Sequence, residues 1–171
     1  MMPMALEVYR PSLEDLWFKE SLLADEATMA YNAAWGGTIA FPREKWADWY
    51  SRWLEVPETE RYYRYLRDGA TGRFVGEIAY RLDGETGVYL CDVIVLAGER
   101  GKGYGTRGLS LLCEAAKRNG VEALYDHIAA DNPSWKLFVK NGFTVVERTS
   151  EAVLVKKELR GPAAGPTDTG V

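Results

Sequence analysis

Apolar and polar residues follow two different spacings along this chain, and these spacings divide it into short strands and helices. Alternation, or a run of β-branched residues, predicts strands at residues 6–12, 61–68, 73–82, 88–96, 122–131, 143–148 and 152–159. Apolar positions that recur every three or four residues predict helices at residues 13–23, 42–53, 106–120 and 132–142. Strands follow one another directly in places and alternate with helices in others, so we expect a mixed α/β sheet, part antiparallel and part parallel.

The second predicted helix carries an aromatic stripe, formed by Trp46, Trp49, Tyr50 and Trp53 at spacings of three and four residues. These rings share one helical face, and aromatic side chains dominate core packing, so we expect the stripe to pack onto the domain core. The preceding glycine-containing loop carries Trp35. Because loops carry much of the binding function of proteins, Trp35 is our candidate for a substrate contact.

Composition places the chain among soluble globular proteins. It has 171 residues, of which 47% are hydrophobic and 27% are charged, as expected for one domain with a substantial core. We assign a single domain to residues 1–160 and expect residues 161–171 to form a disordered tail. No apolar run reaches the roughly 20 residues of a bilayer span, and the first ten residues do not resemble a leader. We therefore expect a cytoplasmic protein with no membrane partner.

Charge is distributed unevenly along the chain. The formal net charge of -4 argues against nucleic acid as a partner. Residues 1–98 carry 16 acidic and 10 basic residues, whereas residues 99–171 carry 9 acidic and 11 basic residues. Such a division suits a cationic substrate that meets an anionic cofactor, although solubilising surface charge produces the same division.

The cysteines and the histidine do not predict a metal site. Cys91 and Cys113 are too far apart to form a closely spaced metal pair, and His127 is the single histidine. We expect both cysteines to be reduced and buried, and His127 to be a core residue rather than a base.

A glycine-rich segment, "ERGKGYG" at residues 99–105, lies between a predicted strand and a predicted helix. Unpaired backbone N–H groups and the helix dipole make this arrangement an anion site, and phosphate is the natural anion. A P-loop is excluded because the GxxxxGK[ST] spacing is missing. "GYGTRG" matches the dinucleotide fingerprint, with Asp126 downstream, but the residues between Leu96 and the glycines and the short remaining chain argue against it.

Two segments resemble motifs of the GNAT superfamily of N-acetyltransferases. "VIVLAGERGKGYGT" is similar to the acyl-CoA-binding motif, and "DNPSWKLFVKNGF" to the helix that lines the pantetheine arm. With the order of elements, the resemblance covers roughly residues 5–160. It implies a mixed, mostly antiparallel sheet of six to seven strands with a splayed central strand pair and about four helices. It also implies transfer of an acetyl group from acetyl-CoA to a primary amine by direct attack.

The resemblance also implies which residues hold coenzyme A. The pyrophosphate would meet the loop and helix start, and the pantetheine would pair with the central strand, where the Val95 N–H would polarise the thioester carbonyl. Asn132 is chosen over Asp131 as the motif's asparagine. The implied cofactor-binding residues are Val93, Ile94, Val95, Arg100, Gly101, Lys102, Gly103, Tyr104, Gly105, Thr106, Asn132, Ser134, Phe138 and Lys140.

The catalytic residues are less determined. A base must deprotonate the amine, and Asp92 on the central strand is the first candidate, although it could instead pair with an arginine. Tyr89 and Glu77 are reserves, because strand alternation could turn Asp92 to the wrong face unless a bulge intervenes. Phe138 stands where the family has a proton-donating tyrosine, so water, Tyr104, Tyr125 or no acid at all would serve the departing thiolate.

Three functions stay open on the sequence alone. The first is an N-acetyltransferase acting on a small-molecule amine, and the acidic first half and Trp35 slightly favour a small cationic acceptor such as a polyamine or aminoglycoside. The second is a non-catalytic acyl-CoA-binding or sensor module, which Phe138 motivates. The third is nicotinamide binding by "GYGTRG". Dimers are common in the family, and the sequence neither shows nor excludes a homodimer.

Overall fold

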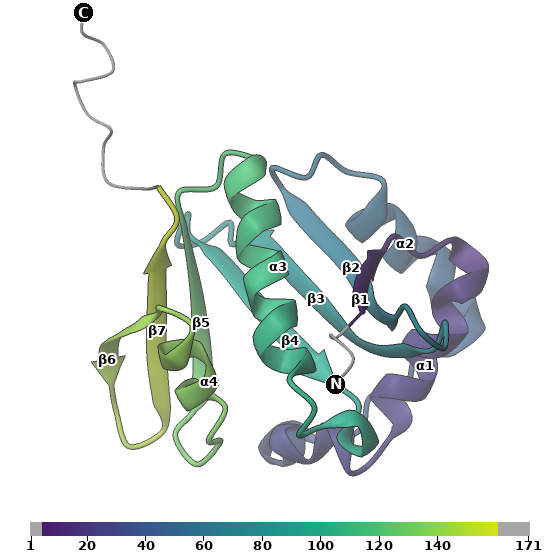
Figure 1. Cartoon of the computed structure of the whole chain (residues 1–171), viewed down its shortest axis with the longest axis horizontal. Helices are drawn as coiled ribbons and strands as arrows, with labels where there is room; N and C mark the ends of the chain where they lie inside the picture. The colour runs from purple at the N-terminus through teal and green to yellow at the C-terminus, as the bar shows by residue number, and fades with distance from the viewer. Residues whose placement is uncertain (1–4, 161–171) are drawn as a thin grey trace, which may run out of the picture.

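A computed structural model describes residues 5–160, so the predicted tail at residues 161–171 lies outside the described residues. Seven strands form one sheet in the order β1-β2-β3-β4-β5-β7-β6 (Figure 1). Their bounds are Leu6–Tyr9 (β1), Arg61–Asp68 (β2), Phe74–Leu82 (β3), Tyr89–Val95 (β4), Ala123–Ala129 (β5), Thr144–Arg148 (β6) and Ala152–Glu158 (β7). Each predicted strand is present, with ends that differ from the prediction by at most three residues.

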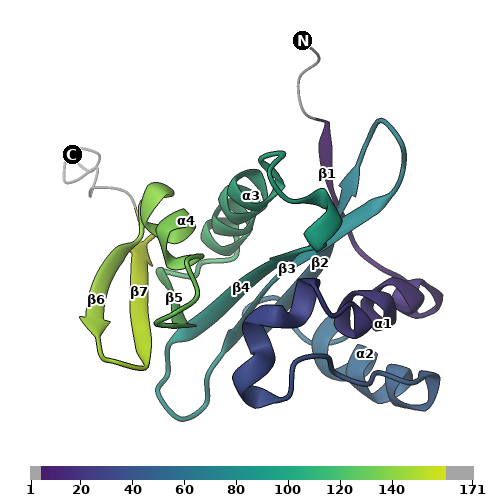
Figure 2. The same ribbon diagram turned by 90° about the horizontal axis from the view of Figure 1, so that it is seen from below.

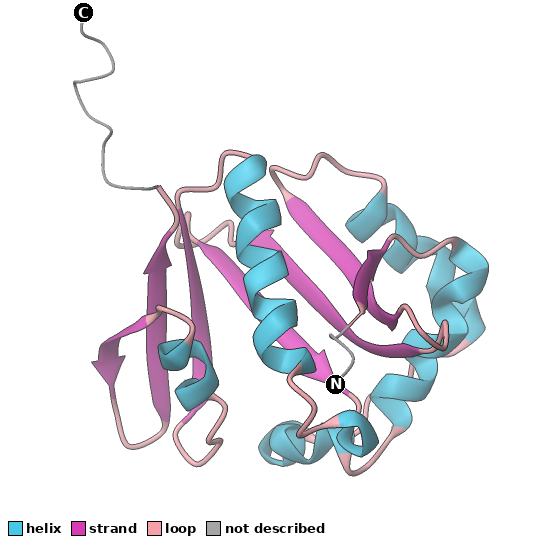
Figure 3. Cartoon of the chain, viewed as in Figure 1, coloured by secondary structure: helices cyan, strands magenta, loops and turns pink. Residues whose placement is uncertain are grey.

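The centre of the sheet is splayed. Among the strands of residues 5–160, only β4 and β5 are parallel neighbours, and they pair at just two positions, Tyr89 with Leu124 and Leu90 with Tyr125. By contrast, β3 and β4 pair at seven consecutive positions. Beyond Leu90 the strands diverge, so that β5, β7 and β6 form a separate leaf of the sheet (Figure 3). This arrangement confirms the expected mixed, mostly antiparallel sheet with a splayed central pair.

Four α-helices of the described chain cover the two faces of the sheet. They are α1 (Leu16–Ala24), α2 (Trp46–Leu54), α3 (Tyr104–Arg118) and α4 (Trp135–Lys140). Figure 2 shows α3 and α4 on one face and α1 and α2 on the other. Short 3-10 segments complete the fold: η1 (Leu13–Asp15), η2 (Thr28–Trp35), η3 (Arg43–Lys45) and η4 (Ala97–Glu99). No helix in residues 5–160 has the length and apolar character needed to cross a membrane.

Helix α3 begins earlier than its apolar spacing predicts. The expected start was Thr106, but the first helical residue is Tyr104, directly after Gly103 at φ +88°. A left-handed residue that glycine adopts without strain can turn the chain immediately before a helix. Gly105 and Gly108 therefore lie inside the helix, and a Cβ at Gly108 would come within 2.7 Å of the Leu66 side chain on β2. Gly108 thus lets α3 pack closely on the sheet.

The core is divided by the sheet. The main cluster lies between the sheet and α3, and contains both free cysteines, Cys91 and Cys113, buried as expected. Two aromatic clusters lie on the other face, under α1 and α2. The predicted aromatic stripe packs here rather than against the main cluster: Trp46 is buried, and Trp49 contacts both aromatic clusters.

Candidate active site

Glu77 of β3 and Asp92 of β4 lie on the same face of the sheet. In the antiparallel register Glu77 is opposite Ile94, and Ala79 is opposite Asp92. Residues two apart on a strand share a face, so the two carboxylates are diagonal neighbours. The register between β3 and β4 has no shift, so no bulge reorients Asp92, and none is needed to bring it to the cavity described next.

A cavity of about 300 Å³ opens where β4 and β5 diverge. Asp92 enters its lining from β4, and Asp126 and His127 enter it from β5. The remaining lining residues are Trp53, Tyr80, Arg81, Leu90 and Cys91. His127 is exposed, so the expectation that it is a core residue was wrong: an edge that β4 has left gives its side chain access to solvent.

The two aspartates of this cavity are difficult to ionise. Although solvent reaches Asp92, the surrounding protein raises its pKa, and the negative charge of Glu77 raises it further. Desolvation raises the pKa of Asp126 well above its ordinary value, and the Asp92 carboxylate adds to the shift. Arg81 lies in the same lining but forms its ion pair with Asp83, at 3.4 Å. The alternative that Asp92 is held by an arginine is therefore not observed among residues 5–160.

Glu77 is buried, and one of its carboxylate oxygens has two partners. Its Oε1 atom lies 3.0 Å from the Lys19 Nζ atom, and it also accepts a hydrogen bond from the Tyr63 hydroxyl. Only 4% of Glu77 and 8% of Lys19 are exposed. A carboxylate already paired with an ammonium group is a poor acceptor for a substrate proton, so this geometry favours Asp92 over Glu77 as the base.

Tyr89 is the first residue of β4, at the opposite end of this strand from the glycine loop. Its hydroxyl donates a hydrogen bond to the Thr59 carbonyl at 2.6 Å, and its ring packs edge-on against Tyr80. Because Tyr89 and Asp92 are three positions apart, their side chains point to opposite faces. This placement speaks against the reserve role of Tyr89 as a base.

Some backbone N–H and C=O groups of β4 point into the gap where β4 and β5 separate. The Leu96 N–H donates to the Val75 carbonyl on β3 at 2.9 Å. Bonded and non-bonded pairs alternate in an antiparallel ladder, so Ile94 directs its backbone groups toward β3, whereas Val93 and Val95 direct theirs toward β5. Since β5 has already separated at that level, these groups are available to an extended ligand. The Val95 N–H thus points toward the gap between β4 and β5, where we predicted a hydrogen-bond donor for the thioester carbonyl.

The glycine loop and the start of α3 suit a phosphate group. Gly101 has φ +80°, and no protein atom lies within 4 Å of the position that a Cβ would take there. The first-turn N–H groups of a helix lack intrahelical acceptors, and Gly103 offers no side chain to cap them. A Cβ at Gly105 would approach the Leu137 side chain of α4 to 3.2 Å, so this glycine serves helix packing. Thr106 is half-buried in the same turn.

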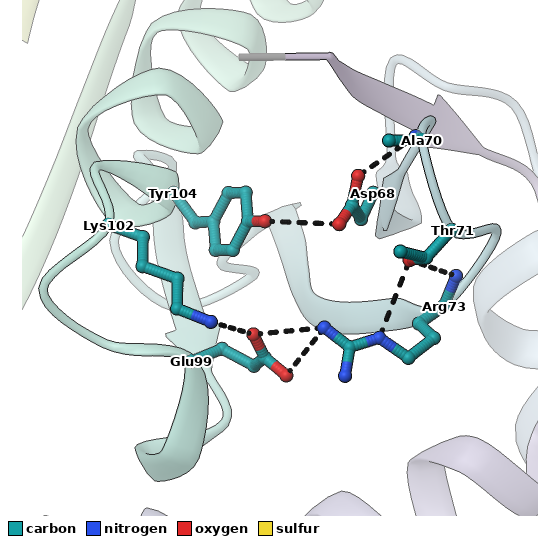
Figure 4. A network of polar contacts seen from close by, with 7 residues as sticks. All are labelled: Asp68, Ala70, Thr71, Arg73, Glu99, Lys102 and Tyr104. Atoms are coloured by element: carbon teal, nitrogen blue, oxygen red, sulfur yellow. Dashed lines mark hydrogen bonds and ion pairs between the residues drawn. The ribbon is translucent and has the colours of Figure 1, made fainter. Parts of the chain in front are cut away.

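The basic side chains of the loop are engaged with protein groups. Lys102 pairs with Glu99 at 2.9 Å, and Arg73 contacts the same carboxylate at 3.1 Å (Figure 4). The Arg100 guanidinium donates to the Thr28 carbonyl at 3.1 Å. In this conformation neither Arg100 nor Lys102 is free, so phosphate binding by either side chain requires these contacts to exchange. Tyr104 is buried, and its hydroxyl lies 3.4 Å from Asp68 (Figure 4).

The second motif forms the turn into α4. Asn132 accepts a hydrogen bond from the Ser134 N–H at 3.0 Å, which leaves its amide nitrogen to act as a donor. Phe138 is 3% exposed and packs edge-on against Phe143, so the core encloses its ring and does not present it to a ligand. Lys140 is exposed at the end of the helix.

The segment η2 borders the carboxylates and was not anticipated as a helix. It carries Trp35, which is 71% exposed, and Tyr31, whose pKa is raised by burial of the hydroxyl and by Asp92, Glu77 and Asp126. Tyr31 and Asp126 were missed as site residues. The acidic residue in the apolar strand "ALYDHIA" was a usable signal for Asp126, whereas nothing in the local sequence distinguishes Tyr31 from other loop tyrosines.

Thr28 connects η2 to the segment that follows β4. Its hydroxyl accepts a hydrogen bond from the Ala97 N–H at 2.9 Å and donates one to Asp25, while its carbonyl receives the Arg100 guanidinium. The side chain is fully buried. Thr28 therefore fixes η2 against the beginning of the glycine loop.

Comparison with known proteins agrees with this geometry. The model of the acetyltransferase (GNAT) family matches residues 12–143. No curated protein sequence gave a match to the chain.

Several solved structures share the fold. The structure of yncA from Salmonella typhimurium with its cofactor acetyl-CoA has a TM-score of 0.75 and 19% identity, over 94% of this chain and 97% of that chain. Spermidine N-acetyltransferase from Vibrio cholerae, in complex with CoA and spermine, has a TM-score of 0.74 and 15% identity, over 91% and 96%. An N-acetyltransferase from Staphylococcus aureus Mu50 has a TM-score of 0.71 and 17% identity, over 91% and 99%.

Proposed function

The chain belongs to the acetyltransferase (GNAT) family, and from this premise we propose that it transfers an acetyl group from acetyl-CoA to the primary amine of a small cationic acceptor. One observation carries the proposal: the divergence of β4 from β5 brings Asp92 to a cavity beside backbone groups that no strand partner occupies. A base and a strip of unpaired backbone at one place are what direct acyl transfer to an amine requires.

Residues of the loop, β4 and α4 would hold coenzyme A. The N–H groups from Gly101 to Thr106 would face its pyrophosphate, and Val93 and Val95 would pair with the pantetheine. Asn132 would contribute its amide N–H. When bound, acetyl-CoA supplies an acetyl group on a thioester, and the Val95 N–H is the donor that we assign to its carbonyl oxygen.

Asp92 is the base of the proposed reaction. A primary ammonium with a pKa near ~10 must lose a proton before its nitrogen can attack, and a carboxylate with a raised pKa accepts that proton more readily than an ordinary one. Asp92 takes the ammonium proton, and the freed amine forms the C–N bond as the C–S bond breaks. The nitrogen then loses a second proton to solvent water, which leaves a neutral amide, and coenzyme A departs as its thiolate. Phe138 cannot protonate this group, but a thiol with a pKa of ~8.5 leaves tolerably without an acid.

A small cationic acceptor fits the charges around the cavity. Asp92 and Asp126 line it, and Glu77 and Tyr31 lie in the same electrostatic neighbourhood. Trp35 offers an exposed ring that could cover an aliphatic amine or its charge. The Vibrio cholerae protein of the same fold was captured with spermine, which supports a polycationic amine as the first class to assay.

Mass spectrometry of amines incubated with the protein and acetyl-CoA tests the proposal. We expect a gain of one acetyl group on at least one small polyamine or aminoglycoside, with none in the absence of protein. The alternative function, an acyl-CoA sensor, draws on Phe138 in place of the family tyrosine. Stabilisation by acetyl-CoA without an acetylated product across the panel would favour the sensor over the enzyme.

A further inference from the structure

A buried ion pair lies beneath the proposed base. Lys19 of α1 and Glu77 of β3 are 58 residues apart in sequence, yet Nζ and Oε1 are 3.0 Å apart. Both side chains are almost completely removed from solvent. Burying two charges costs several kcal/mol each before their attraction is counted, so a pair in this position needs further partners or a function.

Aromatic side chains supply some of the partners. The Lys19 ammonium lies 4.8 Å from the ring centroids of both Trp49 and Tyr63, in cation–π contact with each. The Tyr63 hydroxyl donates to the same Glu77 oxygen that Lys19 contacts. Every bond in this arrangement holds Glu77 as an anion in one orientation, and Lys19 is its single cationic partner among the described residues.

Asp92 lies close enough to sense both charges. As a diagonal neighbour of Glu77 on the adjacent strand, it is separated from Glu77 by roughly 7 Å between Cβ atoms. Glu77 disfavours the charged form of Asp92, and Lys19 favours it. Burial has the largest effect on the Asp92 pKa, and the opposing effects of Glu77 and Lys19 adjust that pKa without either residue touching the substrate.

Other titratable or charged groups face the same region and are kept constant in the experiment below. They are Tyr65 on β2, Arg81 on β3, Cys91 on β4, Asp126 and His127 on β5, Tyr31 on η2, and Arg100 after η4.

We propose that Lys19 is a positioning residue of the active site, which neutralises and immobilises Glu77 so that Asp92 is the carboxylate of this sheet face that accepts the substrate proton. The inference rests on the proposed function for its catalytic meaning. Its physical content, the control of Asp92 by the Lys19–Glu77 pair, can be measured in the free protein.

Carbon-13 NMR of the aspartate and glutamate carboxyl groups measures that content, with the Asp92 signal assigned by its loss in Asp92→Asn. In the unaltered protein we expect Asp92 to take up a proton before Glu77 as the pH falls. In Glu77→Gln, which removes a negative charge and leaves Lys19 positive, the Asp92 midpoint should fall by about one pH unit.

Lys19→Met should shift the protonation midpoint in the opposite direction. With Glu77 unpaired, the first proton that the two carboxyls bind on acidification should bind at a higher pH than in the unaltered protein, whichever carboxyl takes it. In Lys19→Met with Glu77→Gln, the Asp92 midpoint should return between those of the two single variants. Lys45→Met, at an exposed lysine of η3, makes the same chemical change away from the pair and should leave all midpoints in place.

The outcomes separate this inference from the proposed function. Protonation of Glu77 before Asp92 in the unaltered protein overturns the inference, and this result needs no variant to fold. An Asp92 midpoint that is unchanged in Glu77→Gln also overturns it. Absence of acetyl transfer with the expected titrations would contradict the proposed function and leave the control of Asp92 by Lys19 standing.

Discussion

Asp92 of β4 and Asp126 of β5 line one cavity at the point where their strands part, and the negative charge of Asp92 disfavours the charged form of Asp126. Carboxylates without a cationic partner destabilise a folded protein, because the folded state binds their protons more tightly than the unfolded state does. The site therefore stores an electrostatic cost that a cationic acceptor would relieve.

Replacing Asp126 with a neutral side chain should stabilise the folded protein, because it removes this electrostatic cost. The pKa of Asp126 is raised above its unfolded value, so its effect on stability is most favourable below about pH 4 and is lost as the pH rises through the folded pKa. Asp126→Asn should therefore raise the melting temperature at pH 8 more than at pH 5. Thermal unfolding at both pH values measures this difference. A melting temperature lowered equally at both would mean that Asp126 has a stabilising partner.

The pH dependence of activity should report Asp92. The carboxylate accepts a proton only when ionised, so kcat/KM should fall as the pH decreases through its raised pKa, at a higher pH than for an ordinary aspartate. Ionisation of the acceptor amine adds a second pH-dependent limb to the plot of kcat/KM. Asp92→Asn should retain the limb that belongs to the amine and lose the limb that belongs to Asp92. A rate profile with the same acidic limb in both proteins would assign the base elsewhere.

Alanine substitutions at two glycines with similar backbone angles distinguish the effect of backbone strain from an effect on ligand binding. Gly101 in the loop has φ +80°, Gly87 between β3 and β4 has φ +74°, and neither has a protein atom near its Cβ position. Alanine at either position should cost about 1 kcal/mol of stability. Calorimetry with acetyl-CoA should show roughly tenfold weaker binding for Gly101→Ala only, because its added methyl enters the proposed pyrophosphate site. Equal losses of affinity would contradict that placement.

Thr28 should matter more for stability than its position in a 3-10 segment suggests. Thr28→Val preserves the shape of the buried side chain but leaves the half-buried Ala97 N–H without its acceptor, which should cost about 1–3 kcal/mol in urea unfolding. Thr144→Val on the exposed strand β6 is the control, since its hydroxyl is exposed and makes only a 3.4 Å contact with the Lys156 carbonyl. Equal stability of the two variants would show that the hydroxyl of Thr28 contributes nothing beyond its volume.

Local patterns predicted the elements well and their charged contacts poorly. Alternation or runs of β-branched residues located every strand, including β6, which is exposed along its length. The glycine motif placed the start of α3 within two residues. The partners of Glu77 could not be predicted, since Lys19 lies on a helix that reaches β3 only through tertiary packing. The engagement of Arg100 with Thr28 and of Lys102 with Glu99 depends likewise on contacts between loops.

His127 and Phe138 also differ from their expected environments, because tertiary packing determines which side chains are exposed. A lone histidine in an apolar strand is commonly a core residue, yet the divergence of β4 exposes this one. Phe138 matches a motif position associated with the cofactor, but its ring is buried and packs edge-on against Phe143. Sequence spacing does not report where two paired strands separate.

Release of free coenzyme A thiol tests the central claim most directly. The protein is mixed with acetyl-CoA and a panel of polyamines and aminoglycosides, and thiol appearance is followed for the unaltered chain, Asp92→Asn and the surface control Asp48→Asn. We expect amine-dependent release that falls by about 10² to 10⁴-fold in Asp92→Asn and is unchanged in Asp48→Asn. Equal release by the unaltered chain and Asp92→Asn, or none with any amine while acetyl-CoA still raises the melting temperature, would contradict the account.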